Sequence, residues 1–289
     1  MESDGYKTYE NPDELRKIQI LSTLLMDELD RVCTELGISY QAYGGTAIGA
    51  VRHKGFIPWD DDADIAMTRS NFEAFRRIVK RELSDKLEFI MPNEFKSGKV
   101  FYDFTPRIIY KPSARHKKND KKDPYEGKLN HLWVDIFIID KLPKSKLLQR
   151  LTLFSQKLIY LFSMGHRKKL DLKKYKGSMK IAVSVFSIIG KIISMKYLFR
   201  LQDRLSKLFY KSRKSSTLYY SNYQPDYIDI KVNKDWYEKY LNIKFEDTVL
   251  SIIDEYDSVL QLVYGDYMTP PPKADRVPTH GSMEIEVYE

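Results

Sequence analysis

The spacing of apolar residues switches along the chain between a helical and a strand-like period, which predicts an α+β fold. Residues 12–37 place apolar side chains three or four positions apart, as an amphipathic helix does. A short strand is expected over residues 38–43 and a second helix over residues 72–83. Residues 86–140 contain several further strand-like runs, of which the most apolar lies at 132–140.

The segment 144–215 has a different character. Its two apolar stretches, 147–164 and 181–193, are interrupted by basic residues and fall short of the roughly 20 apolar residues of a membrane-spanning helix. They suit helices that pack on the protein core or lie at a membrane interface. Residues 141–215 carry twenty Lys and Arg against two acids, a charge of +18, whereas the whole chain carries +8. This asymmetry indicates a polyanionic partner: a membrane surface, a phosphorylated polymer or nucleic acid.

We therefore expect three parts along the chain. Residues 1–143 form a catalytic core, residues 144–215 form a basic helical insertion, and residues 216–289 complete the core. A last amphipathic helix is expected over residues 247–263, and the prolines at 270–272 begin a tail that cannot continue it.

Composition narrows the class of protein. A hydrophobic content of 43% is sufficient for a substantial core and argues against a disordered chain. The single cysteine, Cys33, cannot form an internal disulfide, and no cluster of Cys and His offers a zinc site. Residues 1–11 are polar and lack the apolar run of a signal peptide. We expect a cytoplasmic protein.

Four aspartates within five residues form the most distinctive motif of the chain. Asp62 and Asp64 alternate along a strand, so both carboxylates project from the same face. Two like charges on one face repel, unless a divalent cation binds between them. Hard oxygen ligands of this kind suit Mg2+ or Mn2+. Asp60 follows the same alternation and is a further candidate ligand, whereas Asp61 is expected to face away.

A glycine pair precedes the aspartates. Gly44 and Gly45 can bring the backbone close to a phosphate, and the helix expected from Thr46 presents free N–H groups to an anion. Arg52 and Lys54 are candidate phosphate contacts, or else ordinary surface charges. A phosphate cradle shortly before a pair of metal-binding carboxylates is the arrangement of nucleotidyltransferase-like folds.

A further carboxylate lies inside the apolar run at 132–140. Asp135 needs a partner there, because burying an isolated charge is costly. It is expected to be a third metal ligand, with a buried salt bridge as the alternative. Asp140 is expected to cap a turn before Pro143.

These residues carry a family resemblance. The run 44–65 is similar to the signature of the LicD family, the phosphocholine transferases related to fukutin. A second similar segment lies at 264–272 and continues to 276–280. The resemblance covers roughly residues 15–140 and 245–281 and leaves the middle of the chain unassigned.

The resemblance implies a fold and a substrate class. The fold would be a nucleotidyltransferase-like mixed β-sheet core flanked by helices. The donor would be CDP-choline, and the acceptor a sugar hydroxyl of a lipid-linked cell-surface glycan precursor of the teichoic acid or lipopolysaccharide type. Arg276 and His280 would contact the substrate. With such an acceptor, the basic segment would hold the protein on the inner face of the plasma membrane.

The expected reaction is Mg2+-dependent transfer of choline phosphate with release of CMP. Asp62 and Asp64 would bind metal that bridges the diphosphate, and Asp135 would complete the metal site or accept the proton of the sugar hydroxyl. Two alternatives remain: nucleotidyl transfer to RNA or a small molecule, and a catalytically silent membrane or glycan adaptor. Nucleic acid is the less favoured partner, because the basic segment lacks interleaved stacking aromatics.

Overall fold

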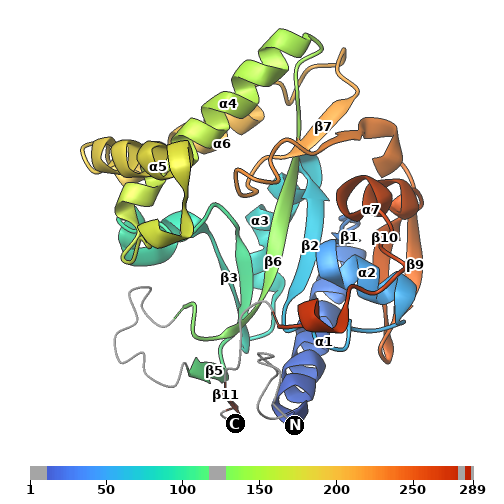
Figure 1. Ribbon diagram of the computed structural model, residues 1–289. Helices are drawn as coiled ribbons and strands as arrows, with labels where there is room; N and C mark the ends of the chain where they lie inside the picture. Colours follow the sequence, from blue (N-terminus) through green and yellow to red (C-terminus); the bar gives the residue numbers. More distant parts are fainter. Residues whose placement is uncertain (1–11, 117–127, 279–283, 288–289) are drawn as a thin grey trace.

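The apolar run expected as a strand forms β6 (Leu132–Lys141), the central strand of the sheet. One edge of β6 pairs in parallel with β2 (Ala63–Thr68). The other edge pairs antiparallel with β4 (Arg107–Tyr110) and, further along, with β7 (Thr217–Tyr220). β6 therefore joins the N-terminal and the C-terminal strands into one mixed sheet (Figure 1).

This computed structural model describes residues 12–116, 128–278 and 284–287. The predicted α+β class is confirmed by its mixed sheet and surrounding helices. The remaining strands of the seven-stranded sheet are β1 (Gln41–Ala42), β3 (Leu87–Ile90) and β8 (Lys231–Asn233). Short 3-10 helices lie in the connections: η1 (Pro92–Gly98), η2 (Met164–His166), η3 (Leu172–Lys174), η4 (Lys234–Tyr237) and η5 (Lys273–Asp275).

The two faces of the sheet differ because side chains alternate along each strand. On one face, Ile65, Val134 and Ile136 are fully buried. They form a single apolar core with α1 (Pro12–Glu35) and α3 (Arg69–Glu82). The predicted N-terminal helix is thus confirmed as α1, and its apolar stripe supports the sheet.

The opposite face of the same two strands carries Asp64 and Asp135, which lie side by side in register. Beyond them on this face, Ala66 and Phe137 pack with residues of α7 (Tyr256–Tyr264) in a second core. The first face is therefore apolar along Ile65, Val134 and Ile136, while the other combines an apolar end with an acidic end.

Residues 146–207 form an arm of three helices beside the sheet (Figure 1). Gly190 allows close packing in this arm, since a Cβ there would overlap the carbonyl oxygen of Phe162. Among the described residues no single helix is long and apolar enough to span a membrane; α5 and α6 pass that test only as a pair bent by 113°. The helices are α4 (Lys146–Ser163), α5 (Gly177–Gly190) and α6 (Met195–Lys207).

The helix expected over residues 247–263 is wrong in its first half. The chain there forms a hairpin of β9 (Tyr240–Phe245) and β10 (Thr248–Ile253), and α7 begins only afterwards. Leu250 and Ile252 are buried, whereas Val249 and Ser251 are more exposed, which is the period of a strand. A separate two-stranded sheet pairs β5 (Ser113–His116) with β11 (Glu284–Val287).

Asp140 does not cap a turn, as the sequence suggested. It lies within β6, where its two oxygens accept from Arg69 at 2.9 and 2.5 Å and its Oδ2 also accepts from Ser221 at 2.6 Å. Burial raises the pKa of Asp140, and the Arg69 guanidinium opposes that rise. Because Arg69 directly follows β2, this ion pair links β2 to β6 at the end of the strands away from Asp64 and Asp135.

Replacing Arg69 tests this pair. We expect Arg69→Met to lower the free energy of unfolding by about 3–5 kcal/mol, since it leaves a buried carboxylate without its partner. Arg76→Met is the matched control: Arg76 pairs with Glu73 at 2.8 Å but is 35% exposed, so the loss should stay below about 1 kcal/mol. Urea denaturation followed by circular dichroism measures both. Equal losses in the two variants would contradict the role of Arg69.

Candidate metal and substrate site

We call the region around Asp60, Asp62, Asp64 and Asp135 the acidic site. It begins where β2 and β6 run side by side. The parallel register places Asp64 directly beside Asp135. The backbone N–H of Asp64 donates to Oγ1 of Thr46 at 2.8 Å, and its carbonyl accepts from the N–H of Tyr43 at 3.0 Å. Asp64 is thereby fixed against the start of α2 (Gly44–Arg52).

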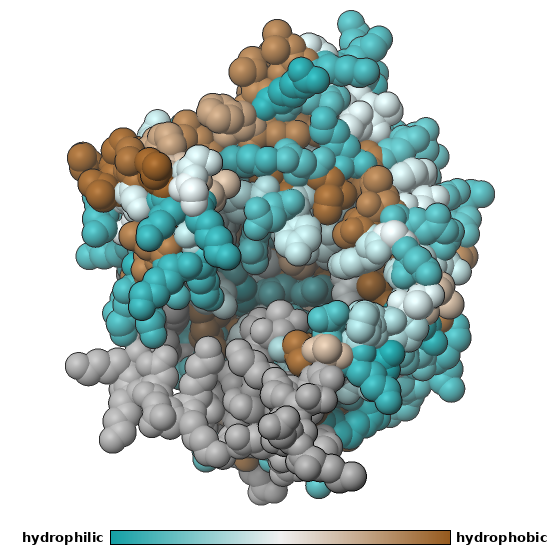
Figure 2. Space-filling view, in the orientation of Figure 1, coloured by the Kyte–Doolittle hydropathy of each residue, from teal (hydrophilic) through white to brown (hydrophobic). Residues whose placement is uncertain are grey.

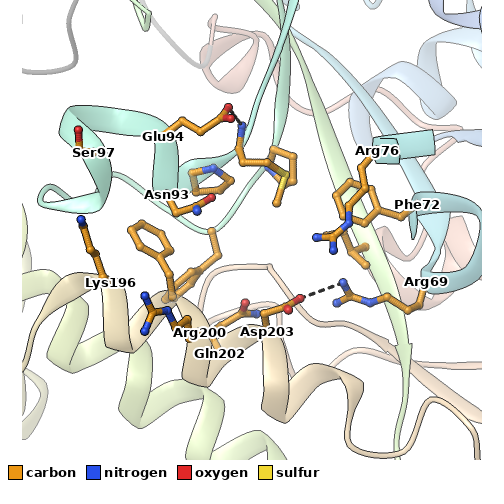
Figure 3. Close-up of a pocket in the computed structure, with 16 residues that line it drawn as sticks. Arg69, Phe72, Arg76, Asn93, Glu94, Ser97, Lys196, Arg200, Gln202 and Asp203 are labelled. Atoms are coloured by element: carbon orange, nitrogen blue, oxygen red, sulfur yellow. Dashed lines mark hydrogen bonds and ion pairs between the residues drawn. The ribbon is translucent and has the colours of Figure 1, made fainter. Parts of the chain in front are cut away.

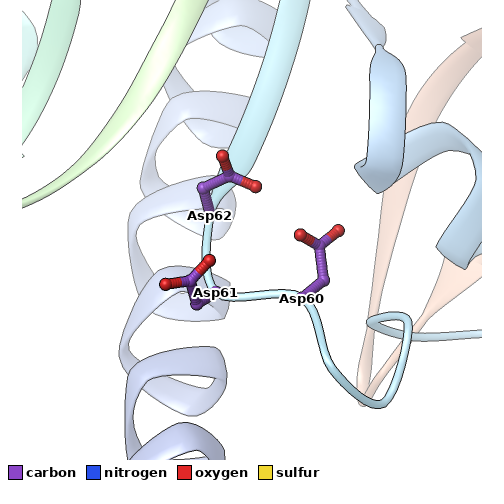
Figure 4. A group of neighbouring side chains, drawn as sticks. All are labelled: Asp60, Asp61 and Asp62. Carbon is purple, nitrogen blue, oxygen red and sulfur yellow. The ribbon is translucent and has the colours of Figure 1, made fainter. Parts of the chain in front are cut away.

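Asp60 and Asp62 extend the acidic site along the segment that leads into β2. Asp62 stands one residue before the strand. Figure 4 shows the carboxyl groups of Asp60 and Asp62 turned toward each other. One carboxyl oxygen from each of Asp60, Asp61 and Asp62 lies within 4.8 Å of the others. The Asp61 carboxyl group therefore lies nearer to those of Asp60 and Asp62 than alternation along a strand predicts.

The glycine pair lies at the N-terminus of α2, against these carboxylates. A Cβ at Gly45 would overlap Oδ2 of Asp60, and a Cβ at Gly44 would lie 3.0 Å from Oδ2 of Asp64. Gly44 also has a φ of +58°, which favours glycine. The pair makes room for the carboxylates, and the positive end of the helix dipole faces them. Phosphate binding by Gly44, Gly45 and Thr46 stays a prediction.

The carboxylates repel one another in this geometry. Burial, together with the neighbouring Asp62, raises the pKa of Asp60 well above its usual value. Burial, Asp62, Asp135 and Asp60 raise the pKa of Asp64 well above its usual value. Both shifts reflect buried negative charge without enough positive charge nearby. A divalent cation would provide that charge.

The donor set fits Mg2+ or Mn2+. All the groups that converge are carboxylate oxygens, which these ions prefer. Among the described residues, Oδ2 of Asp60 is buried and has no hydrogen-bond partner. An orphaned buried acceptor is costly and is expected where a ligand binds. Asp60, Asp61 and Asp62 therefore place carboxyl oxygens close enough to hold an ion, and Asp64 beside Asp135 stays a predicted part of the same site.

Sequence reasoning missed Arg107, which is 2% exposed. Its Nε lies 2.7 Å from Oδ1 of Asp135, and its Nη2 donates to Oδ2 of Asp103 at 2.6 Å. The Arg107 guanidinium thus holds the Asp135 carboxylate in a fixed position. An arginine opening the apolar strand 107–110 was the available signal.

The predicted basic contacts lie at the other end of α2. Arg52 donates to the carbonyl of Tyr267 at 2.5 Å, and burial and the nearby Arg276 lower the pKa of Arg52. Arg276 lies 5.2 Å from the centre of the Trp59 ring. The nine residues of α2 separate Arg52 from the glycine pair by about 12 Å. The structure thus brings Arg52 and Arg276 together, one helix length from the glycines.

The other two predicted contacts are less informative. The Lys54 side chain is exposed, and the Lys54 carbonyl accepts from the N–H of Glu246 at 2.8 Å. His280 lies outside the described residues.

A cavity of about 550 Å³ lies away from the acidic site, between α3, η1 and α6 (Figure 3). Its charged lining is mainly basic and includes Arg69, Arg76, Lys196 and Arg200. Asp203 balances part of this charge through its 3.3 Å ion pair with Arg69. No metal-binding cluster lies among these lining residues, so we place the candidate site at the aspartates, in spite of the cavity's size.

Comparison with known proteins agrees with the resemblance seen in the sequence. Residues 37–157 match the profile described as LicD/FKTN/FKRP, nucleotidyltransferase domain. The matched part contains Gly44, Gly45, the aspartates of the acidic site and Arg107.

Individual relatives extend the similarity beyond this domain. The chain is 27% identical over 271 residues to the lipopolysaccharide cholinephosphotransferase LicD of Haemophilus influenzae, covering 92% of this chain and 96% of that protein. Two uncharacterized Rickettsia proteins match shorter stretches. The protein of R. typhi is 40% identical over 55 residues, which cover 19% of this chain and 18% of that protein. The protein of R. prowazekii is 46% identical over 43 residues, which cover 15% of this chain and 16% of that protein.

Gly45→Ala tests the acidic site without removing any carboxylate. The new Cβ displaces Asp60, so we expect the affinity for Mn2+ to fall about 10- to 100-fold, as for other residues that orient metal ligands. Electron paramagnetic resonance of free Mn2+ measures this affinity, and the melting temperature checks that the variant is folded. A folded variant with unchanged affinity would exclude Asp60 from the ion site.

Proposed function

We propose that this protein is a Mg2+-dependent phosphocholine transferase that uses CDP-choline and releases CMP. The observation that carries the proposal is the convergence of Asp60, Asp62, Asp64 and Asp135 at the N-terminus of α2, within the part of the chain that matches the LicD profile. The cholinephosphotransferase similar to this chain along nearly its whole length supports the choice of phosphocholine. We also propose that the core has a nucleotidyltransferase-like fold.

The role of the carboxylates in the reaction follows from the charge that develops on the leaving group. In transfer of choline phosphate, negative charge develops on the departing CMP and must be stabilised. A divalent cation held by these carboxylates would supply that stabilisation. The chain's own contribution is to hold four carboxylates in fixed positions: Thr46 fixes Asp64, and Arg107 fixes Asp135. Preorganised ligands of this kind need no rearrangement when the charge develops.

The basic pair at the end of α2 extends this site. Arg52 and Arg276 are like charges close enough to perturb one another, an arrangement that an anion between them would stabilise. We propose that they contact the anionic part of the donor or acceptor, with Lys54 and His280 as further contacts. The acceptor is a sugar hydroxyl of a lipid-linked glycan precursor of the lipopolysaccharide or teichoic acid type.

CMP release is the direct test. We expect purified protein to release CMP from CDP-choline with Mg2+ and a membrane extract, and Asp62→Ala plus Asp64→Ala to abolish that release, since both lose ion ligands. Lys196→Ala, in the separate basic cavity, is the control that should retain activity. If the protein turned over other nucleotide donors but not CDP-choline, the assignment of choline as the head group would be wrong. ATP-dependent labelling of RNA would instead indicate a nucleotidyltransferase, and binding without any turnover an adaptor.

We further propose that α4 and α5 hold the protein on an anionic membrane surface at the cytoplasmic side. Figure 2 shows apolar surface gathered over these two helices. Phe154, Ile181, Ile188 and Ile192 are 64%, 67%, 65% and 86% exposed. Large apolar side chains so exposed on two adjacent helices and in the turn after α5, within a segment of charge +18, fit a surface that is apolar and negatively charged.

Vesicle binding tests this surface. We expect Ile181→Ser plus Ile188→Ser to weaken binding to phosphatidylserine-containing vesicles at least about tenfold, because each isoleucine contributes about 1.5–3 kcal/mol when buried. The matched control is Leu241→Ser plus Val249→Ser, two residues of the β9–β10 hairpin that are 44% and 49% exposed. Co-sedimentation measures binding. An equal loss in both double variants, or none in either, would contradict the proposed surface.

A further inference from the structure

Aromatic rings from several distant segments meet beside the acidic site. Tyr223 stacks at 4.7 Å from Phe137 and at 4.8 Å from Tyr227, measured between ring centres. Tyr43, which directly precedes α2, lies 4.9 Å from Phe137 and 6.1 Å from Tyr223. We call Tyr223, Tyr227 and Tyr264 the tyrosine cluster, with Tyr43 and Phe137 as its buried base.

The tyrosine cluster adjoins the aspartates. A Cβ built on Gly44 would lie 3.0 Å from Oδ2 of Asp64 and 3.5 Å from the hydroxyl oxygen of Tyr264. Asp64 and Tyr264 therefore border the same small space beside Gly44. Burial, followed by the charge of Asp64, raises the pKa of the Tyr223 hydroxyl. Tyr223, Tyr227 and Asp64 also contribute to the raised pKa of Tyr264, after burial. The cluster therefore borders the carboxylate of Asp64.

Exposure changes across the cluster in the way expected of a binding site. The base is closed, with Tyr43 and Phe137 at 3% and 8% exposed. The rim is open, with Tyr227 and Tyr264 at 45% and 41% exposed. Large aromatic side chains left half in water beside buried negative charge offer both a π-face and an opposite charge to a cation.

The kind of cation follows from these groups. A metal ion prefers the carboxylate oxygens, whereas a quaternary ammonium has no N–H to donate and is weakly hydrated, so it gains most from aromatic faces. A primary ammonium would instead lose hydrogen bonds to water that ring faces replace poorly. The ring faces thus favour a methylated ammonium, and the nearby carboxylate adds attraction for its positive charge.

We infer that Tyr223, Tyr227 and Tyr264 form the subsite for the quaternary ammonium group of the transferred choline phosphate. This inference rests on the proposed function and deepens it, since it assigns the residues that select the head group. The phosphate end of the substrate lies toward Asp62 and Asp64, and the ammonium end lies against the rings. The subsite discriminates against ethanolamine phosphate, whose ammonium carries three N–H donors.

Tyr227 gives the sharpest test, because it lies on the exposed rim of the cluster. We expect Tyr227→Leu to raise the KM for CDP-choline about tenfold and to leave that for CDP-ethanolamine almost unchanged. Tyr227→Phe, which keeps the ring, should retain the wild-type preference. Tyr197→Leu replaces a tyrosine on α6 that is 53% exposed and serves as the control.

The outcomes separate the subsite from the proposed function. If wild type turns over CDP-choline and Tyr227→Leu keeps the same preference over CDP-ethanolamine, the subsite is wrong and the function stands. If wild type does not turn over CDP-choline, the proposed function fails. Saturation-transfer NMR on the methyl protons of choline chloride then tests the subsite alone: a signal lost in Tyr227→Leu supports it, and one kept there or absent from wild type overturns it.

Discussion

The structure depends on the close approach of four carboxylates to the start of one short helix. Like charges repel strongly at these distances, and the repulsion is greatest where water is excluded. Several features exist to hold them there: two glycines remove side chains from α2, Thr46 fixes the backbone of Asp64, and the parallel register sets Asp135 beside it. Such an arrangement is unfavourable by itself, and a bound cation would offset the repulsion.

The remainder of the sheet makes this arrangement rigid. The face opposite the aspartates packs on α1 and α3, so β2 and β6 cannot separate without exposing a large apolar core. At the far end of the same strands, Arg69 and Asp140 form a buried ion pair. At the near end, Arg107 ties β4 to Asp135. The acidic site is thus supported by packing on one side and by ion pairs at both ends.

The spacing of apolar and acidic residues predicted those features of the structure that lie within a single segment of the chain. The apolar stripe of α1 and the helical arm both follow from periodicity within one segment, and the structure agrees with them. Asp62 stands just before β2, so its common face with Asp64 stays a prediction. The strand β10 was mistaken for the start of a helix, because its short apolar run also fits a helical period. Arg107 and the tyrosine cluster could not be assigned, because their partners come from strands and loops distant in the chain.

The glycine pair shows how one residue pattern admits two physical causes. From the sequence, glycine allows the backbone to approach a phosphate; in the structure, the space is taken by Asp60 and Asp64. The two roles are compatible, since a helix N-terminus that faces carboxylates also faces any ion and phosphate bound to them.

The central claim is that the aspartates bind a divalent cation. Anomalous diffraction from a crystal grown with Mn2+ and CMP tests it most directly. We predict an anomalous peak within coordination distance, about 2.0–2.6 Å, of carboxylate oxygens from Asp62 and Asp64. No peak at these residues, in a crystal whose CMP is nonetheless ordered beside α2, would contradict the account.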